Sequence, residues 1–290
     1  MAPPLASEIV SVPLSPRRRV PLGVALAFGW IGAMLLIAVL ADMIWPYSIT
    51  ALHLTARLAP PVGFGGSMTF PLGTDELGRD VLSRLIVSVR ISLLIAFGAS
   101  ALGLMLGATL GLIAAHLRGI VEQAVLLLVD VQAALPFIIL ALAVLAFFGN
   151  SLPLLIGLLA LYGWERHARV TRGMALAANT QGYIMAVRQL GAGPWRVYAY
   201  HVLPNIAATL IVSVTLAFPE IILLESGLSF LGLGVQPPMT SLGNMIGYGR
   251  GYISSAPWIM LAPGVVIVLT TLAISIGGDW LRDRLDPTLS

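Results

Sequence analysis

Six apolar stretches, separated by polar segments, dominate this sequence of 290 residues. Most of them are long enough to cross a hydrocarbon core about 30 Å thick, which takes about 20 residues of α-helix. Hydrophobic residues make up 58% of the chain and charged residues only 10%, so too little charge is left to cover a soluble surface. With a mean hydropathy of +0.94, the chain is predicted to be an all-α membrane protein with several spans.

The apolar stretches run over about residues 20–44, 91–115, 121–148, 152–164, 206–224 and 257–276, and each predicts one transmembrane helix. The fourth is short, and it reaches full length only by continuing through Glu165 toward Arg169, whose long side chain can extend to the membrane interface. Residues 1–19 are predicted to form a disordered tail that ends in Arg17, Arg18 and Arg19. The run that follows is too long for a signal peptide, so residues 20–45 are expected to be an uncleaved first span.

The distribution of Arg predicts the orientation of the spans. A cytoplasmic N-terminus places eleven of the sixteen Arg on the cytoplasmic side, as the positive-inside rule favours. Residues 46–90 then form an extracytoplasmic loop, and residues 91–280 form a core of about five transmembrane helices with a large cytoplasmic loop at 166–205. Residues 281–290 are predicted to be a cytoplasmic tail.

Two missing residue types narrow the chemistry. The chain contains no Cys, which excludes thiol nucleophiles and thiolate metal sites. It contains no Lys either, so it cannot form the P-loop that needs a Lys on the phosphates of ATP. The four His (His53, His116, His167 and His201) lie in separate segments without a zinc motif, and no metal site is predicted. If ATP drives this protein, another chain must bind it.

Residues 71–84 predict an amphipathic helix that leads into the second span. Thr74 is a plausible N-cap, Asp75 and Glu76 suit a helix N-terminus, and Asp80 and Arg84 are spaced for an ion pair. Such a helix could cover the outer end of the bundle, or it could take part in docking a partner or in gating.

The cytoplasmic loop at 166–205 predicts two short helices, one over 181–190 that Gly191 ends and one that begins at Pro194 and ends at Pro204. Apolar residues recur at helical spacing on both pieces. They either pack against the bundle itself or insert into a groove of a soluble partner. The five Arg of the loop suit anionic lipid or an acidic partner.

Three carboxylates fall in or near the predicted spans, where ionisable groups are expensive and usually functional. Asp130 either has a structural role or lines a pathway, as a proton relay for example. Glu220 and Glu225 are either solvated at the interface or line the path. Glu225 also begins a segment rich in Gly and Pro, residues 225–238, which predicts non-helical backbone lining an outer vestibule.

The loop at 183–205 resembles the EAA loop of bacterial ABC importer permeases, and Ala186, Gly191, Leu203 and Pro204 fall at the spacing of that motif. Four other stretches, at 71–84, 225–238, 255–258 and 278–287, resemble the second permease subunit of the dipeptide, oligopeptide and nickel importers. Met185 stands where the family has the Glu of the motif, and Val187 replaces its second Ala. The usual polar contact of that Glu is therefore missing, whereas the apolar face remains. Ser226 and Gly227 also replace the more usual pair of alanines.

The resemblance implies a type I importer permease in the bacterial inner membrane that forms half of a pathway for peptides or related small solutes. It implies a homologous second permease, two ABC ATPases that carry ATP and Mg²⁺, an extracytoplasmic solute-binding protein, and no cofactor or catalysis on this chain. The loop would couple ATPase closure to the spans through these residues: Ile184, Ala186, Val187, Leu190, Gly191, Trp195, Tyr198, Leu203 and Pro204.

Two other classes of function compete with this interpretation. One is a proton-coupled secondary transporter that uses Asp130, Glu220 or Glu225. The other is an intramembrane enzyme, which the lack of a paired nucleophile and base disfavours. The solute itself stays open between dipeptides, oligopeptides, nickel and others.

Overall fold

The computed structural model describes residues 20–285, and this part of the chain is helical, with an isolated bridge between Thr74 and Asp80 in place of a sheet. The predicted tail at 1–19 and the last residues of the predicted C-terminal tail lie outside the described residues. The helices are α1 (Leu22–Ile44), α2 (Val81–Leu117), α3 (Gly119–Ala134), α4 (Phe137–Phe148), α5 (Leu152–Asn179), α6 (Gly182–Gln189), α7 (Pro194–Val197), α8 (Leu203–Phe230), α9 (Leu242–Gly249) and α10 (Trp258–Leu285). Two short 3₁₀ helices (η1, Leu54–Ala56, and η3, Arg250–Tyr252) and a π-helical turn (η2, Tyr198–Val202) complete the order.

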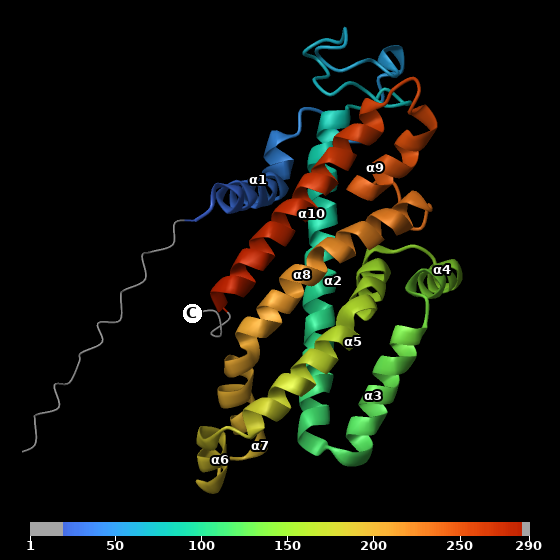
Figure 1. The fold of residues 1–290 in the computed structure, drawn as a ribbon. Helices are drawn as coiled ribbons and strands as arrows, with labels where there is room; N and C mark the ends of the chain where they lie inside the picture. The colour runs from blue at the N-terminus through green and yellow to red at the C-terminus, as the bar shows by residue number, and fades with distance from the viewer. Residues whose placement is uncertain (1–19, 286–290) are drawn as a thin grey trace, which may run out of the picture.

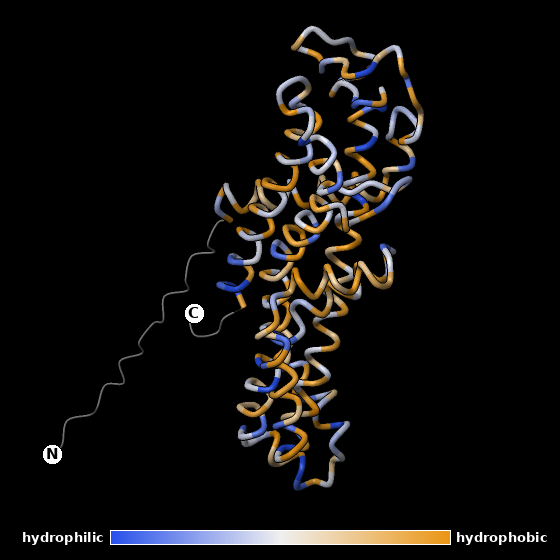
Figure 2. Tube along the Cα trace, turned by 90° about the vertical axis from the view of Figure 1, so that its right-hand side faces the viewer, coloured by the Kyte–Doolittle hydropathy of each residue, from blue (hydrophilic) through white to orange (hydrophobic). Residues whose placement is uncertain are grey.

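The molecule is an elongated bundle in which α2 runs along most of the length (Figure 1). The segment before α2 lies at one end, near α9, and α6 and α7 lie at the other end (Figure 1). α1 lies at the side of the bundle and contacts α10 and α2. Hydrophobic residues cover most of the length of the helices (Figure 2).

Four helices in the described part of the chain are long and apolar enough to cross a membrane: α1, α2, the continuous helix Pro194–Phe230, and α10. The pair α3 and α4 makes a fifth candidate if it counts as one span, although the two helices are bent by 89°. The helix at the predicted fourth span, α5, is not among these candidates, and it carries three Arg and Glu165 in its second half. The prediction of an all-α membrane protein is confirmed. Four of the six predicted spans meet the criterion of length and apolarity, and a fifth meets it if the bent pair counts as one span.

The bend between α3 and α4 occurs at Leu135 and Pro136. Proline has no N–H and disfavours helical geometry in the residue before it, and Leu135 accordingly has an extended ψ of 127°. The stretch predicted as one span over 121–148 therefore consists of two helices that meet at a sharp bend.

Two boundaries of the predicted loop at 166–205 also differ. The loop begins inside α5, which continues to Asn179, and the helix from Pro194 does not end at Pro204. The chain passes through Pro204 because the π-helical turn η2 directly precedes it, with the Leu203 N–H bonded to the Tyr198 carbonyl. Gly191 does end α6 as predicted, with φ of +85°.

A seam of glycines joins α2 to α5. Gly103, Gly107 and Gly111 are spaced by four residues, so they lie on one face of α2, and they contact the backbone at Ala160, Trp164 and Ala168 of α5. A Cβ at Gly103 would lie 2.9 Å from the Ala160 carbonyl oxygen, and one at Gly111 would lie 2.6 Å from that of Ala168. Small residues at this spacing let helix backbones approach closely in membranes. The seam fixes which face of α5 points away from α2.

We expect Gly107→Ala to destabilise the bundle, because its Cβ would overlap the Trp164 carbonyl group. Overpacking of this kind costs about 1–3 kcal/mol. Gly157→Ala is the matched control, since a Cβ there meets no described atom within 4 Å and Ala favours a helix interior by about 0.5–1 kcal/mol. The measurement is the apparent Tm of the purified protein in detergent. An unchanged Tm for Gly107→Ala would contradict the seam.

Candidate functional site

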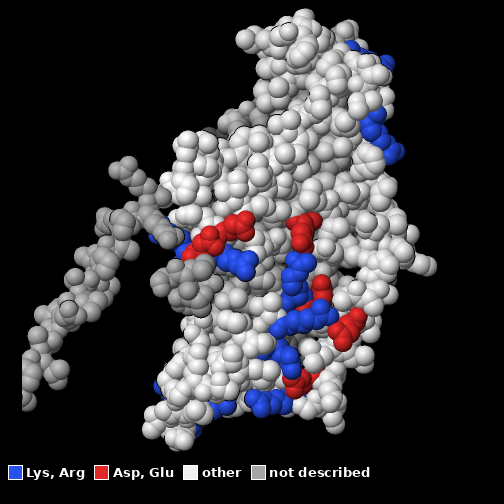
Figure 3. All heavy atoms as spheres, viewed as in Figure 1, with Lys and Arg blue, Asp and Glu red and all other residues white. Residues whose placement is uncertain are grey.

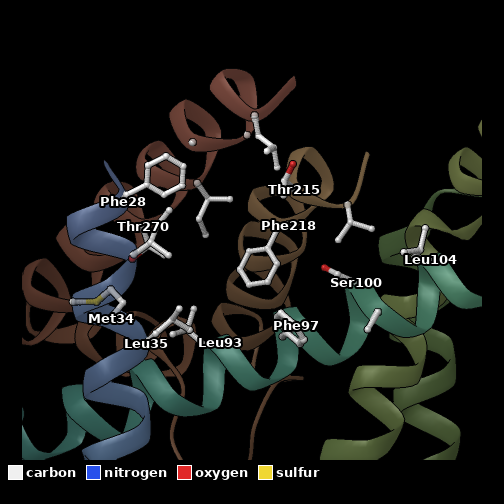
Figure 4. A pocket seen from close by; sticks show the side chains of 17 residues that line it. Phe28, Met34, Leu35, Leu93, Phe97, Ser100, Leu104, Thr215, Phe218 and Thr270 are labelled. Atoms are coloured by element: carbon white, nitrogen blue, oxygen red, sulfur yellow. The ribbon is translucent and has the colours of Figure 1, made fainter. Parts of the chain in front are cut away.

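The first candidate site is an apolar cavity that opens to the surface of the chain. A cavity of about 410 Å³ lies between α1, α2, α8 and α10 (Figure 4). Its lining is apolar apart from the hydroxyl groups of Ser100, Thr215 and Thr270, and the Trp30 indole N–H already donates to Thr270 at 3.1 Å. The cavity offers no charged side chain, so it does not suit a charged solute.

A second candidate is a column of charges on α5. Arg166, Arg169 and Arg172 recur every three residues, so they follow one face of the helix. Arg166 and Arg169 point away from the glycine seam, which contacts Ala160, Trp164 and Ala168, whereas the backbone of Arg172 lies close to Gly111.

Each of these Arg pairs with a carboxylate of a neighbouring helix. Arg166 Nη1 lies 3.2 Å from Glu220 Oε2 of α8. Arg169 Nη2 lies 2.9 Å from Asp130 Oδ1 of α3, and Arg172 Nε donates to Glu122 Oε1 of α3 at 2.6 Å. We call the surface made by these six side chains the charged face. It appears as a column of alternating colours over α5, α3 and α8 on a surface that is otherwise mostly uncharged (Figure 3).

The charged face is open and lies along the bundle. The side chains of Arg166 and Arg169 are 52% and 48% exposed, and those of Glu220 and Asp130 are 42% and 70% exposed. Arg166 and Arg169 lie near the middle of α5, and Asp130 lies about 16 Å along α3 from its start at 1.5 Å per residue. A charge in the centre of a bilayer costs about 2.5–3.5 kcal/mol, so contact between these side chains and lipid tails would be unfavourable. Exposed ion pairs in water contribute only about 0–1 kcal/mol, so these pairs open easily once water reaches them.

Glu225 differs from the other two predicted carboxylates. It is 1% exposed, and its Oε1 accepts hydrogen bonds from the hydroxyl groups of Ser229 and Ser241, both at 2.7 Å. It is therefore neither solvated at an interface nor exposed to a path in this conformation. The non-helical backbone predicted from Glu225 begins later, because α8 continues to Phe230.

A third candidate is the hairpin formed by α6, α7 and η2, residues 182–202, which we call the terminal hairpin. Its inner side packs on the bundle: Ile184, Val197, Tyr198 and Val202 are buried in one cluster with Ala175 and Ile206. Its outer side is apolar but uncovered, with Leu190 87% and Trp195 81% exposed. Tyr183, Met185 and Tyr200 are also exposed.

The structure thus divides the residues that the sequence suggested for docking. Ile184 and Tyr198 face the bundle, so the interpretation in which the loop packs on its own bundle is right for them. Val187 is half-buried on the same cluster. Leu190 and Trp195 point outward, as do Ala186, Leu203 and Pro204. Both sides of the hairpin are apolar, and periodicity alone could not tell which one is covered.

A hydrogen-bonded chain ties the terminal hairpin to the bundle. Arg188 of α6 donates to Asn179 Oδ1 at the end of α5 at 2.7 Å, and Asn179 Nδ2 donates to the Tyr198 hydroxyl at 3.0 Å. The Tyr198 ring contacts the His116 ring at the end of α2 edge to face, with centroids 5.2 Å apart. The hairpin is therefore linked to α5 and α2 by polar as well as apolar contacts.

The polar segment at 71–84 is a compact cap, and the helix predicted over it is corrected. α2 begins only at Val81, and its N-cap is Asp80, which accepts from the Ser83 N–H, so Thr74 is no cap. Thr74 instead holds the loop together, since its hydroxyl accepts from the Ala59 N–H at 2.8 Å and its carbonyl accepts from the Trp258 indole at 3.1 Å.

The ion pair predicted within this segment is also different. Arg84 pairs with Asp75 at 2.8 Å rather than with Asp80, and both side chains are buried. Asp75 also pairs with Arg79 at 2.6 Å and accepts from the Leu77 N–H. This set of bonds is internal to the cap, which favours the covering role over a docking role.

Sequence reasoning missed the Arg column and the glycine seam. The predicted loop began at Arg166, although the fourth span was expected to continue toward Arg169 to reach full length. The spacing of three between Arg166, Arg169 and Arg172, together with two unpaired carboxylates in the predicted spans, was a signal that could have revealed the column. The spacing of four between Gly103, Gly107 and Gly111 was a signal for the seam.

The fold is that of an ABC transporter permease. It is similar to a chain of the MetNI methionine ABC transporter in an inward-facing conformation, with a TM-score of 0.58 and 24% identity over 71% of this chain and 97% of that chain. A second structure of the same transporter matches with a TM-score of 0.57. At this level of identity the similarity shows the fold, which is the type I permease fold.

Sequence comparisons show the family. Residues 107–290 match the model of the binding-protein-dependent transport system inner membrane component. The chain is 41% identical to the di/tripeptide transport system permease protein DppC of Pseudomonas aeruginosa, over 91% of this chain and 88% of that protein. It is 37% identical to the glutathione transport system permease protein GsiD of Pectobacterium atrosepticum, over 78% and 75%. The chain belongs to the binding-protein-dependent transport system inner membrane component family.

We expect Asp75→Ala to destabilise the protein strongly, because it leaves Arg84 buried without its partner. Removing one member of a buried ion pair costs about 3–5 kcal/mol. The control is Asp42→Ala, which breaks the exposed pair with Arg90 at 2.7 Å and costs about 0–1 kcal/mol. The measurement is the apparent Tm of each variant in detergent. Equal shifts for the two variants would show that the buried pair is not structural.

Proposed function

We propose that this chain is one of two permease subunits of an ATP-driven importer for peptides or related small solutes. The relatives that carry peptide names support the solute class, and the matching family supports delivery by a solute-binding protein. The absence of Lys from the sequence, and with it of a P-loop, supports ATP and Mg²⁺ being bound by two separate ATPase subunits. The chain itself then performs no catalysis and carries no cofactor.

The single observation that carries this proposal is the uncovered apolar side of the terminal hairpin. Leu190 and Trp195 expose most of their surface beyond the apolar helices, where nothing in residues 20–285 covers them. Aromatic and aliphatic side chains presented on a short helix suit a hydrophobic groove of a soluble partner. The ATPase docks here, which puts this end of the bundle and both chain termini in the cytoplasm.

The same hairpin transmits movement because its inner side is packed. Ile184 and Val202 are fully buried against the cytoplasmic ends of the bundle, and Arg188 is bonded to Asn179 of α5. When the ATPases close, the hairpin moves with them, and it shifts α5 and α8 as rigid bodies. Met185 stands at the position of the family's Glu, so docking rests on apolar contact rather than on that carboxylate.

The alternative, a proton-coupled transporter, lacks support in the geometry. Asp130 and Glu220 are engaged with Arg169 and Arg166, and Glu225 is buried among Ser hydroxyl groups. The three carboxylates thus do not form one chain of proton sites. We propose that ATP, and not a proton gradient, drives transport.

We expect Leu190→Glu and Trp195→Glu to uncouple the complex, because each places a charge in an apolar groove. Loss of one such anchor costs about 2 kcal/mol or more, which lowers solute-stimulated ATPase activity and uptake at least about tenfold. Membrane insertion of the chain should be unchanged, since neither side chain is buried in it.

Ile120→Glu is the matched control. Ile120 is 85% exposed in the first turn of α3, near the same end of the bundle, but it lies outside the hairpin. We expect this variant to retain coupling. Normal coupling in all three variants would contradict the proposed docking surface.

A further inference from the structure

The charged face leaves most of its hydrogen-bonding capacity unused. An Arg guanidinium has five N–H donors, yet within residues 20–285 Arg169 donates only from Nη2 and Arg166 only from Nη1. About half of each of these two side chains is exposed, so solvent can reach the guanidinium groups. If a dry protein surface covered them, they would be left unpaired, which is unfavourable. These donors are therefore best satisfied by hydrogen bonds to water or to a polar solute.

The flanks of the charged face are also open. Gly163 lies one turn before Arg166 on α5, and Gly173 lies one turn after Arg169. A Cβ at either glycine would meet no described atom within 4 Å. There is therefore room for a side chain at both positions beside the column of charges.

The charges on this face alternate in sign between facing helices. Positive groups come from α5, and negative groups come from α3 and α8, at three successive levels. A solute that carries both an ammonium group and a carboxylate can replace the intramolecular partners one level at a time. The pairs Arg166–Glu220 and Arg169–Asp130 are about half exposed. When a solute group replaces one partner of such a pair, a charge-assisted hydrogen bond within the protein is replaced by one to the solute, in contact with water.

We infer that the charged face is the wall of a water-filled translocation path between this chain and its partner permease, and that it contacts solutes bearing both an ammonium group and a carboxylate. The inference rests on the proposed function, since it requires a second permease to close the path. In it the Arg of α5 bind the solute carboxylate, and Asp130 and Glu220 bind the ammonium group.

The absence of Cys from the chain allows a direct test by thiol accessibility. Gly163→Cys and Gly173→Cys place one thiol beside the charged face, and Gly32→Cys places one near the middle of α1, where a Cβ also meets no described atom within 4 Å. The assembled complex in membranes is treated with a membrane-impermeant methanethiosulfonate, which reacts with the thiolate and so requires water at the site. We expect labelling at residues 163 and 173, dependent on the nucleotide state, and none at residue 32.

A second measurement tests the charges themselves. In the Gly173→Cys background, the rate of an anionic methanethiosulfonate is divided by that of a cationic one. We expect Arg169→Gln to lower this ratio about tenfold and Asp130→Asn to raise it, because each removes one sign of the local field. An unchanged ratio in both variants would show that these groups do not face the water of the path.

The outcome separates this inference from the proposed function. A complex that couples ATP hydrolysis to uptake but has unreactive thiols at 163 and 173 in every nucleotide state overturns the inference alone. A chain that does not co-purify with ATPase subunits overturns the proposed function instead. Labelling at residue 32 equal to that at residue 173 also overturns the inference, because the reagent would then not report a path.

Discussion

The close approach of α2 and α5 along Gly103, Gly107 and Gly111 is the contact on which the rest of the arrangement depends. It brings two long helices together at backbone distance, which only residues without a Cβ allow. It also sets the rotation of α5, so that Ala160, Trp164 and Ala168 face α2 while Arg166 and Arg169 face outward. A helix with this many charges is stable in the bundle because the seam holds one side of it and carboxylates of α3 and α8 pair with the other.

α5 connects the two functional surfaces. Its middle carries the Arg of the charged face, and its last residue, Asn179, is bonded to Arg188 of the terminal hairpin. If an ATPase displaces the hairpin as we propose, the displacement would reach the Arg column through one continuous helix. The apolar cavity beside α1 lies on another side of the bundle and is lined by helices other than α5. In the proposed mechanism, α5 therefore links the docking surface to the residues that contact the solute.

Much of the fold could be predicted from the length of the apolar runs, as in α1 and α10. In a membrane, a run of this kind forms a helix because the helix satisfies all of its backbone hydrogen bonds internally. α5 was predicted too short, since its Arg look like the end of a span until their partners on other helices are known. Asp80 and Thr74 are both good N-cap residues, and only the tertiary contacts of Thr74 with Ala59 and Trp258 decide between them. On the terminal hairpin, Leu190 and Ile184 have the same chemistry, and packing alone determines that one is exposed and the other buried.

The most direct test of the proposed function is uptake of a radiolabelled dipeptide into proteoliposomes that contain this chain with its partner permease, ATPases and binding protein. We predict uptake that requires ATP and intact ATPase subunits and that persists when the proton gradient is collapsed. Uptake driven by a proton gradient in the absence of the ATPase subunits would contradict it.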